Sequence, residues 1–238
     1  MSEVLTISRQ GDVATFTMNT PENRHDPKMI SELHSALDGV EEDKSIKAVI
    51  LASASEKNWC LGLDLNWFST GPSADEVEAF LLEANRLFRR LLALNVPVIA
   101  QLNGHTFGNG AILACACDFR FMKSDRGYFC FPEVDLSIPF LPSMLKVVEK
   151  AMPIQYFNRL ALTGRRVGAV ELFEEKVIEG QFENAEALEK GVMEFASQFK
   201  KQRWIFGKNK QRMYQHIFDL MDKEDLPFIK QSAQAMGQ

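Results

Sequence analysis

Glu133 is the residue of this 238-residue chain whose setting best suits acid–base chemistry. It follows the apolar segment 129–131 and Pro132, with few polar residues before it. A carboxyl group in apolar surroundings has a raised pKa, which lets it exchange protons near neutral pH. A lone glutamate after a strand more often lies on the surface, so the residue by itself leaves both interpretations open.

A glycine-containing segment at residues 103–111 (NGHTFGNGA) could supply backbone N–H groups to the same site. It stands between an expected strand and an expected helix, and a helix N-terminus offers free N–H groups and a partial positive charge. Such amides can stabilise an oxyanion. The glycine order matches neither the dinucleotide nor the phosphate-loop pattern. A turn that needs glycine for packing is an equally good interpretation.

A second segment, residues 58–65 (NWCLGLDL), follows an expected strand at 49–52. Gly62 permits a tight turn, and Asp64 is well placed to cap a short helix that starts at Leu65. Such a turn can direct the N–H of Leu63 into a cavity. A plain strand-to-helix loop is the commoner explanation of this pattern taken alone.

The elements that must position these residues alternate between strands and helices. Residues 4–8 and 13–18 suggest a hairpin, and further strands are expected at 47–52, 97–102, 119–122 and 128–131. Apolar residues at helical spacing predict helices after Pro27, over 75–93 and over 110–117, and helical patterns dominate from about residue 141. This alternation predicts an α/β architecture with parallel strands. We divide the chain into a core, 1–195, and a C-terminal helical region, 196–238.

The composition excludes several classes of protein. A formal net charge of −5 disfavours nucleic-acid binding, and 46% hydrophobic with 25% charged residues is typical of a soluble globular protein. No secretory signal, run of ~18 apolar residues or peroxisomal C-terminal address is evident. We therefore expect a cytoplasmic protein without a membrane partner. Neither a metal site nor a disulfide framework is expected from the four cysteines, Cys60, Cys115, Cys117 and Cys130.

Taken in order, these segments resemble the crotonase superfamily of enoyl-CoA hydratases and isomerases. The resemblance covers roughly residues 4–220 and rests on 60–65 (CLGLDL), 97–104 (PVIAQLNG), 108–110 (GNG) and 131–133 (FPE). The stretch from Phe121 to Asp135 and residues 24–27 (RHDP) are similar to plant-type Δ3,Δ2-enoyl-CoA isomerases. The resemblance implies a spiral of ββα units with a helical C-terminal trimerisation region.

The resemblance also implies roles for individual residues. The N–H groups of Leu63 and Asn109 match the two oxyanion-hole donors, and Glu133 matches a catalytic glutamate. The carbonyl of Leu61 matches the contact to the adenine amino group of CoA. Arg24, Lys208 and Lys210 are further candidates for binding CoA, which arrives as part of the acyl-CoA substrate, so no other cofactor is expected. A solvated helical face is the alternative for the two lysines.

Ile112 is the main departure from the family pattern. Hydratases carry a first glutamate at this place, and isoleucine cannot hold or activate water. This favours a Δ3,Δ2-enoyl-CoA isomerase that works with Glu133 alone. The alternatives are enoyl-CoA hydration, dienoyl-CoA isomerisation, thioester hydrolysis, or acyl-CoA binding without catalysis. Asn109, where glycine is common, is a lesser departure that puts a side chain beside the oxyanion.

Two further expectations concern apolar residues. Trp67, Phe68, Phe131 and Phe140 could line an acyl pocket, although aromatic packing in the core is the default interpretation. The terminal segment is rich in apolar side chains, and large exposed patches usually form interfaces. We therefore expect a homotrimer or a dimer of trimers. The apolar residues of this segment are Trp204, Ile205, Phe206, Met213, Ile217, Phe218, Leu220, Met221, Leu226, Phe228 and Ile229.

Overall fold

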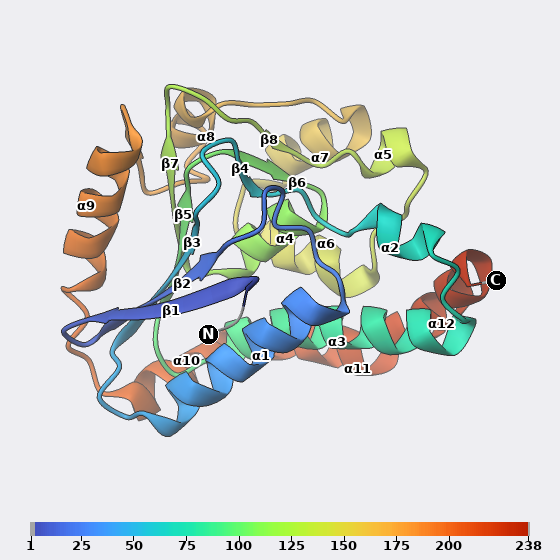
Figure 1. Ribbon diagram of the computed structural model, residues 1–238, viewed down its shortest axis with the longest axis horizontal. Helices are drawn as coiled ribbons and strands as arrows, with labels where there is room; N and C mark the ends of the chain where they lie inside the picture. The colour runs from blue at the N-terminus through green and yellow to red at the C-terminus, as the bar shows by residue number, and fades with distance from the viewer. Residues whose placement is uncertain (1–2, 238) are drawn as a thin grey trace.

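A six-stranded sheet forms the centre of the protein in a computed structural model that describes residues 3–237 (Figure 1). Its strands, in spatial order, are β1 (Leu5–Gln10), β2 (Val13–Met18), β3 (Ala48–Ser53), β5 (Val98–Leu102), β7 (Phe119–Lys123) and β9 (Gly180–Phe182). The hairpin of β1 and β2 is antiparallel, and every other neighbouring pair is parallel. The predicted α/β architecture with parallel pairing is therefore confirmed.

A second, smaller sheet lies beside the first and carries the site. It consists of three parallel strands, β4 (Asn58–Cys60), β6 (His105–Phe107) and β8 (Phe129–Cys130). The sequence predicted a strand only at β8. For β4 and β6 the sequence favours loops, because three residues are too few for an alternating pattern to show.

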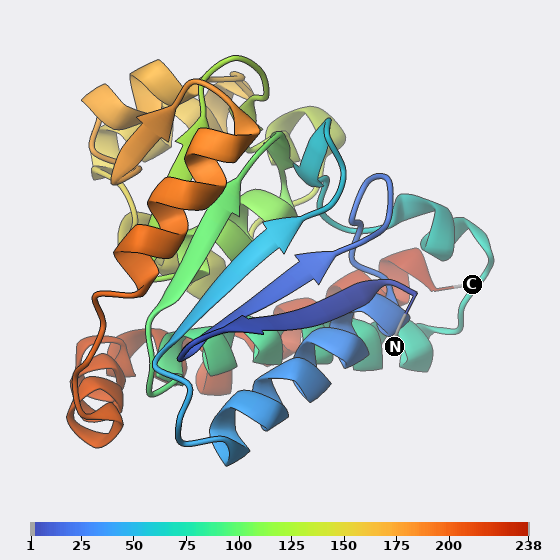
Figure 2. The same ribbon diagram turned by 60° about the vertical axis from the view of Figure 1, so that its left-hand side comes forward.

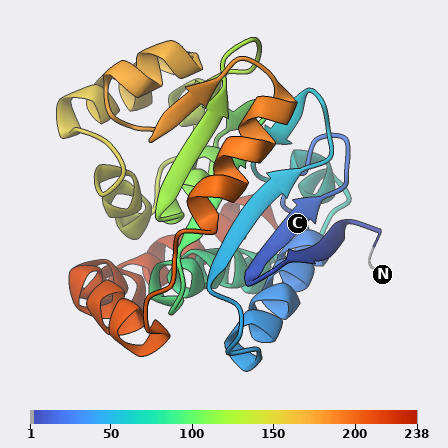
Figure 3. The same cartoon turned by 90° about the vertical axis from the view of Figure 1, so that its left-hand side faces the viewer.

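Helices cover both faces of the large sheet. On one face lie α1 (Pro27–Glu42) and α3 (Ala74–Ala93), below the strands in Figure 2. On the other face, α9 (Ala185–Ala196) packs against β3, β5, β7 and β9, as Figure 3 shows. Because both faces are covered, every residue of β3 is buried, as expected for a parallel strand with a continuous apolar run.

The start of each long helix follows from its sequence. Asp26 caps α1 by accepting a hydrogen bond from the N–H of Met29. Pro27 occupies the first turn, where the N–H that proline lacks would have no partner within the helix. Ser73 and Glu76 form a reciprocal capping box at the start of α3. The remaining helices before residue 200 are α2 (Leu65–Ser69), α4 (Asn109–Ala116), α5 (Glu133–Leu136), α6 (Pro142–Glu149), α7 (Ile154–Thr163) and α8 (Ala169–Glu174).

The C-terminal helices fold back onto the core. They are α10 (Arg203–Met213), α11 (Gln215–Lys223) and α12 (Asp225–Met236), and they contact α3 and α6. Asp225 is fully buried and accepts hydrogen bonds from Asn85 Nδ2 of α3, at 2.8 Å, and from the N–H and hydroxyl of Ser143 in α6. A buried carboxylate is tolerated only with such donors, so Asp225 fixes α12 to two other helices.

Most apolar residues of this terminal region are either buried or exposed, and Phe206 and Leu220 are intermediate. Ile217, Phe218, Met221 and Ile229 are buried against the chain's own core. Trp204 is 65% exposed and Met213 is 60% exposed, and Leu226 and Phe228 are also exposed. Within the described residues, no helix is long and apolar enough to cross a membrane.

We predict that the exposed apolar group is covered by other copies of the chain, which gives a trimer or a dimer of trimers. Size-exclusion chromatography with light scattering at micromolar concentration measures the mass directly. The expected mass is three or six times the 27.0 kDa of one chain. A monomer of 27.0 kDa would refute the prediction.

Candidate active site

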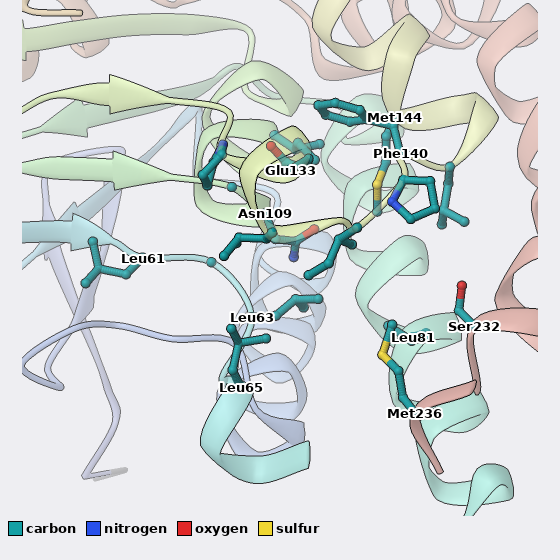
Figure 4. A pocket seen from close by; sticks show the side chains of 18 of the residues that line it. Leu61, Leu63, Leu65, Leu81, Asn109, Glu133, Phe140, Met144, Ser232 and Met236 are labelled. Atoms are coloured by element: carbon teal, nitrogen blue, oxygen red, sulfur yellow. The ribbon is translucent and has the colours of Figure 1, made fainter. Parts of the chain in front are cut away.

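The three strands of the small sheet end at the same edge, and the chain after each strand enters one cavity. Leu61 and Leu63 follow β4, Asn109 follows β6, and Glu133 follows β8 (Figure 4). Parallel strands place their carboxyl ends together, which is where ligands bind in many α/β proteins. The three segments singled out in the sequence are therefore brought together by this sheet.

Glycine is required where the first two segments touch. Gly62 has φ +83°, and a Cβ atom there would lie 2.9 Å from both Asn109 N and Phe107 O. A Cβ atom on Gly110 would lie 2.5 Å from Cys60 O. Any side chain at these two positions would force the backbones apart, so both glycines act by permitting close approach.

Two backbone N–H groups are left free at this contact. Within residues 3–237, neither Leu63 N–H nor Asn109 N–H donates a hydrogen bond, whereas the neighbouring His25 N–H and Asp64 N–H bond to Gly62 O and His25 O. Asn109 is the first residue of α4, whose N-terminus adds a partial positive charge. These two donors have the character of an oxyanion hole.

Cations fix the opposite end of α4. Lys150 Nζ donates to Cys115 O and Cys117 O, both at 2.8 Å, and Arg120 Nη1 donates to Cys117 O at 2.9 Å. Positive charge at a helix C-terminus is favourable, and these bonds satisfy carbonyl groups that the helix leaves unpaired. The helix that presents Asn109 is therefore held at both ends.

Glu133 is a buried carboxyl group with an unpaired oxygen. Its side chain is 9% exposed, and Oε2 accepts no hydrogen bond from the described residues. Burial raises the pKa of Glu133 to about 7, although its own backbone N–H opposes the shift. A Cβ atom on Gly108 would lie 3.6 Å from Glu133 Oε1, so the carboxyl group stands above the turn that leads to Asn109.

The cavity has a volume of about 120 Å³ and walls that are mainly apolar. Ile112 lies in its wall, at the position discussed above, and Phe140 also lines it. Three of the four aromatic residues expected there line no part of it. Phe131 packs against Phe140 and Phe157, and Trp67 and Phe68 pack against Phe80. Apolar side chains contribute most of the wall: Leu61, Leu63, Leu65, Leu81, Leu136, Ile138, Leu141, Met144, Ile229 and Met236.

The candidate CoA-binding residues fall into two groups. Arg24 and Leu61 line the cavity, where Arg24 Nη1 lies 3.5 Å from Leu61 O and 3.3 Å from Leu63 O. The two lysines line no part of it. Lys208 is exposed and borders a separate groove beside Trp204.

Lys210 requires a correction. It is 4% exposed, and its Nζ donates to Leu91 O at 2.8 Å and pairs with Asp118 Oδ2 at 2.7 Å. The ammonium group is turned inward because the buried Asp118 carboxylate needs a cation. Lys210 therefore joins α10 to the core and does not face a ligand.

Sequence reasoning missed two contributors to the site. His25 is fully buried, and its Nδ1 lies 2.8 Å from Asn109 Nδ2. Helix α12 supplies Ile229, Ser232 and Met236 to the far wall of the cavity. No local pattern could reveal either contact, because the partners are 84 residues apart in the first case and α12 is placed by tertiary packing in the second.

Taken together, the geometry suits removal of a proton next to a carbonyl group. Two free N–H groups can hold the carbonyl oxygen, and a carboxyl group with pKa about 7 can exchange the proton. The enoyl-CoA hydratase/isomerase family pattern matches residues 8–226 of the chain. The protein belongs to this family.

Relatives and solved structures agree with this assignment. The carnitinyl-CoA dehydratase of Escherichia coli K12 is 31% identical over 193 residues, which cover 79% of this chain and 72% of the relative. An enoyl-CoA hydratase/isomerase family protein from Pseudomonas syringae has the same fold, with a TM-score of 0.84, 22% identity and 98% of each chain covered. An enoyl-CoA hydratase from Geobacillus kaustophilus HTA426 aligns with a TM-score of 0.79 and 21% identity, over 99% of this chain and 89% of its own. The crotonase-like fold expected from the sequence is confirmed.

We predict that Glu133→Gln stabilises the protein above neutral pH. The pKa of Glu133 is raised from 4.5 to about 7, so the folded state resists ionisation that the unfolded chain undergoes freely. The wild type therefore loses stability as pH rises from about 4.5 to 7, and the variant does not. At pH 8 we expect the variant to be more stable by about 3 kcal/mol, and at pH 4 we expect no difference.

Urea unfolding at the two pH values measures this difference. Glu174→Gln is the matched control, because Glu174 is exposed and lies away from the cavity. A Glu133→Gln variant that is less stable than wild type at pH 8 would show that the ionised carboxylate has partners in the fold.

Proposed function

We propose that this protein is a Δ3,Δ2-enoyl-CoA isomerase that moves a double bond from C3 to C2 of an acyl-CoA. The observation that carries the proposal is the number of carboxyl groups in the cavity wall. Among the described residues that line it, Glu133 is the one carboxylate, and Ile112 occupies the place where hydratases carry another. A reaction that needs a single group to carry the proton is consistent with one carboxylate.

The reaction uses the free N–H groups first. A 3-enoyl-CoA binds with its thioester oxygen between Leu63 N–H and Asn109 N–H. Glu133 takes a proton from C2, and the electron pair of the C–H bond moves into a dienolate whose charge rests on the thioester oxygen. A preorganised donor of this kind contributes about 3 kcal/mol to the stability of such a state.

Glu133 then completes the cycle as an acid. It returns the proton to C4, the double bond forms between C2 and C3, and the carboxylate is regenerated. A carboxyl group with pKa about 7 suits both steps, because it is partly ionised at neutral pH and still a competent acid. CoA enters as part of the substrate, with the Leu61 carbonyl and Arg24 in the cavity wall as its proposed contacts, and no other cofactor takes part.

The relatives named as hydratases and dehydratases favour related reactions on acyl-CoA, which are the main alternatives. Addition or removal of water requires a group that holds the water and one that handles the α-proton. Ile112 offers no hydrogen bond, so Glu133 would have to perform both tasks. The absence of a hydrogen-bonding group at Ile112 therefore favours isomerisation. We also propose that the protein is cytoplasmic and acts on free acyl-CoA.

We predict that Glu133→Gln lowers isomerase turnover at least ~100-fold, because the proton carrier is lost while the cavity keeps its shape. The substrate 3-hexenoyl-CoA is suitable, since the conjugated product absorbs in the ultraviolet. In the wild type, kcat/KM should rise with pH and level off above about 7, where Glu133 is ionised. Near-normal turnover in this variant, with Glu174→Gln as control, would remove Glu133 from the mechanism.

A second prediction separates isomerisation from hydration. The purified protein should isomerise 3-hexenoyl-CoA much faster than it hydrates crotonyl-CoA. Ile112→Glu would restore a carboxylate and should raise the hydration rate relative to isomerisation. The hydratase interpretation would prevail if the wild type hydrates crotonyl-CoA the faster of the two.

A further inference from the structure

The side chain of Asn109 lies in the cavity, although only the backbone N–H of this residue is used in the proposed reaction. It is 7% exposed and extends into the cavity between Glu133 and Leu63 (Figure 4). Its Nδ2 lies 2.8 Å from His25 Nδ1. Its Oδ1 accepts no hydrogen bond from residues 3–237 and is not sealed off, so it remains accessible from the cavity.

The orientation of this amide is fixed by a buried chain of hydrogen bonds. Cys60 Sγ lies 3.0 Å from Asn23 O, which can only accept, so the single thiol hydrogen points to that carbonyl. His25 Nε2, 3.3 Å from the same sulfur, must then carry the ring hydrogen. This leaves Nδ1 as an acceptor, and the Asn109 amide has to present Nδ2 to the ring and Oδ1 to the cavity.

The histidine stays in this state over the physiological range. His25 is fully buried, and burial lowers its pKa to about 4. A neutral ring with one acceptor nitrogen therefore holds the amide at neutral pH. Among the described residues, the hydrogen-bond partners of the ring nitrogens are Asn109 and Cys60, and neither carries a charge.

An exposed acceptor in an apolar wall selects among ligands. An unsubstituted acyl chain would displace water from Oδ1 and leave it without a donor, which is unfavourable. A hydroxyl group on the chain close to the thioester could donate to Oδ1 and remove that cost. Ser232, on α12, is the other uncharged polar side chain among the described residues of the wall.

We propose that Asn109, oriented by His25, is a specificity residue whose Oδ1 accepts a hydrogen bond from a hydroxyl group on the acyl chain. The preferred ligands are then hydroxy-substituted acyl-CoAs. The inference rests on the acyl-CoA site proposed above, but it concerns binding and does not depend on isomerisation. His25 acts through Asn109 and is a positioning residue.

The test compares the dissociation constants of three ligands by isothermal titration calorimetry. The ligands are butyryl-CoA and each enantiomer of 3-hydroxybutyryl-CoA, and the protein carries Glu133→Gln so that nothing turns over. We expect one enantiomer to bind about 5-fold more tightly than butyryl-CoA, the ratio of one net hydrogen bond. Adding Asn109→Ala should bring the ratio close to one, while the backbone N–H remains.

Two more variants keep the test decisive. His25→Phe leaves Asn109 in place but removes the acceptor that orients it, and should lower the ratio at least twofold. This variant provides an independent test of the same ratio if Asn109→Ala does not fold. Ser232→Ala should leave the ratio unchanged. An unaltered ratio in the Asn109 variant, or loss of the ratio only in the Ser232 variant, would overturn the inference.

The outcome is separable from that of the proposed function. A protein that isomerises 3-hexenoyl-CoA but shows no preference for the hydroxylated ligand retains the function and loses the inference. A protein without isomerase activity whose preference disappears with Asn109→Ala retains the inference and loses the function.

Discussion

The site depends on one constraint: two backbone segments must touch where the strands of the small sheet end. The contact requires the absence of side chains at Gly62 and Gly110, because a Cβ atom would approach the opposite backbone to 2.9 Å and 2.5 Å. Hydrogen bonds around His25 and the cations at the far end of α4 keep the segments in register. The contact also brings Leu63 and Asn109, whose N–H groups have no acceptor among residues 3–237, to the wall of one cavity.

The apolar cavity has two opposite effects on the protein. It destabilises the ionised form of Glu133, which reduces the stability of the fold at neutral and higher pH. The same destabilisation places the pKa of the carboxyl group where it can both accept and return a proton. A better-solvated glutamate would make a more stable protein but a weaker base, so in the proposed reaction the instability of this carboxylate is useful.

The sequence predicted the long elements and the three site segments well, for identifiable physical reasons. The apolar runs of β3 and β5, the capped amphipathic helices α1 and α3, and Asp64 as the cap of α2 all depend on local patterns. What could not be predicted depends on distant partners. Lys210 is buried because it forms an ion pair with Asp118. The hydrogen bond between His25 and Asn109 joins residues that are 84 positions apart in the sequence. Strands β4 and β6 were missed because a pattern needs more than three residues to show.

Helix α12 has a consequence for how the site is completed. The glycine contact and Glu133 lie within the first 133 residues, but the cavity beside them is closed by residues much later in the chain. The wall made by Ile229, Ser232 and Met236 arrives only when Asp225 docks on Asn85 and Ser143. Ligand binding is therefore coupled to the docking of α12, because a chain with this helix detached lacks one wall of the cavity.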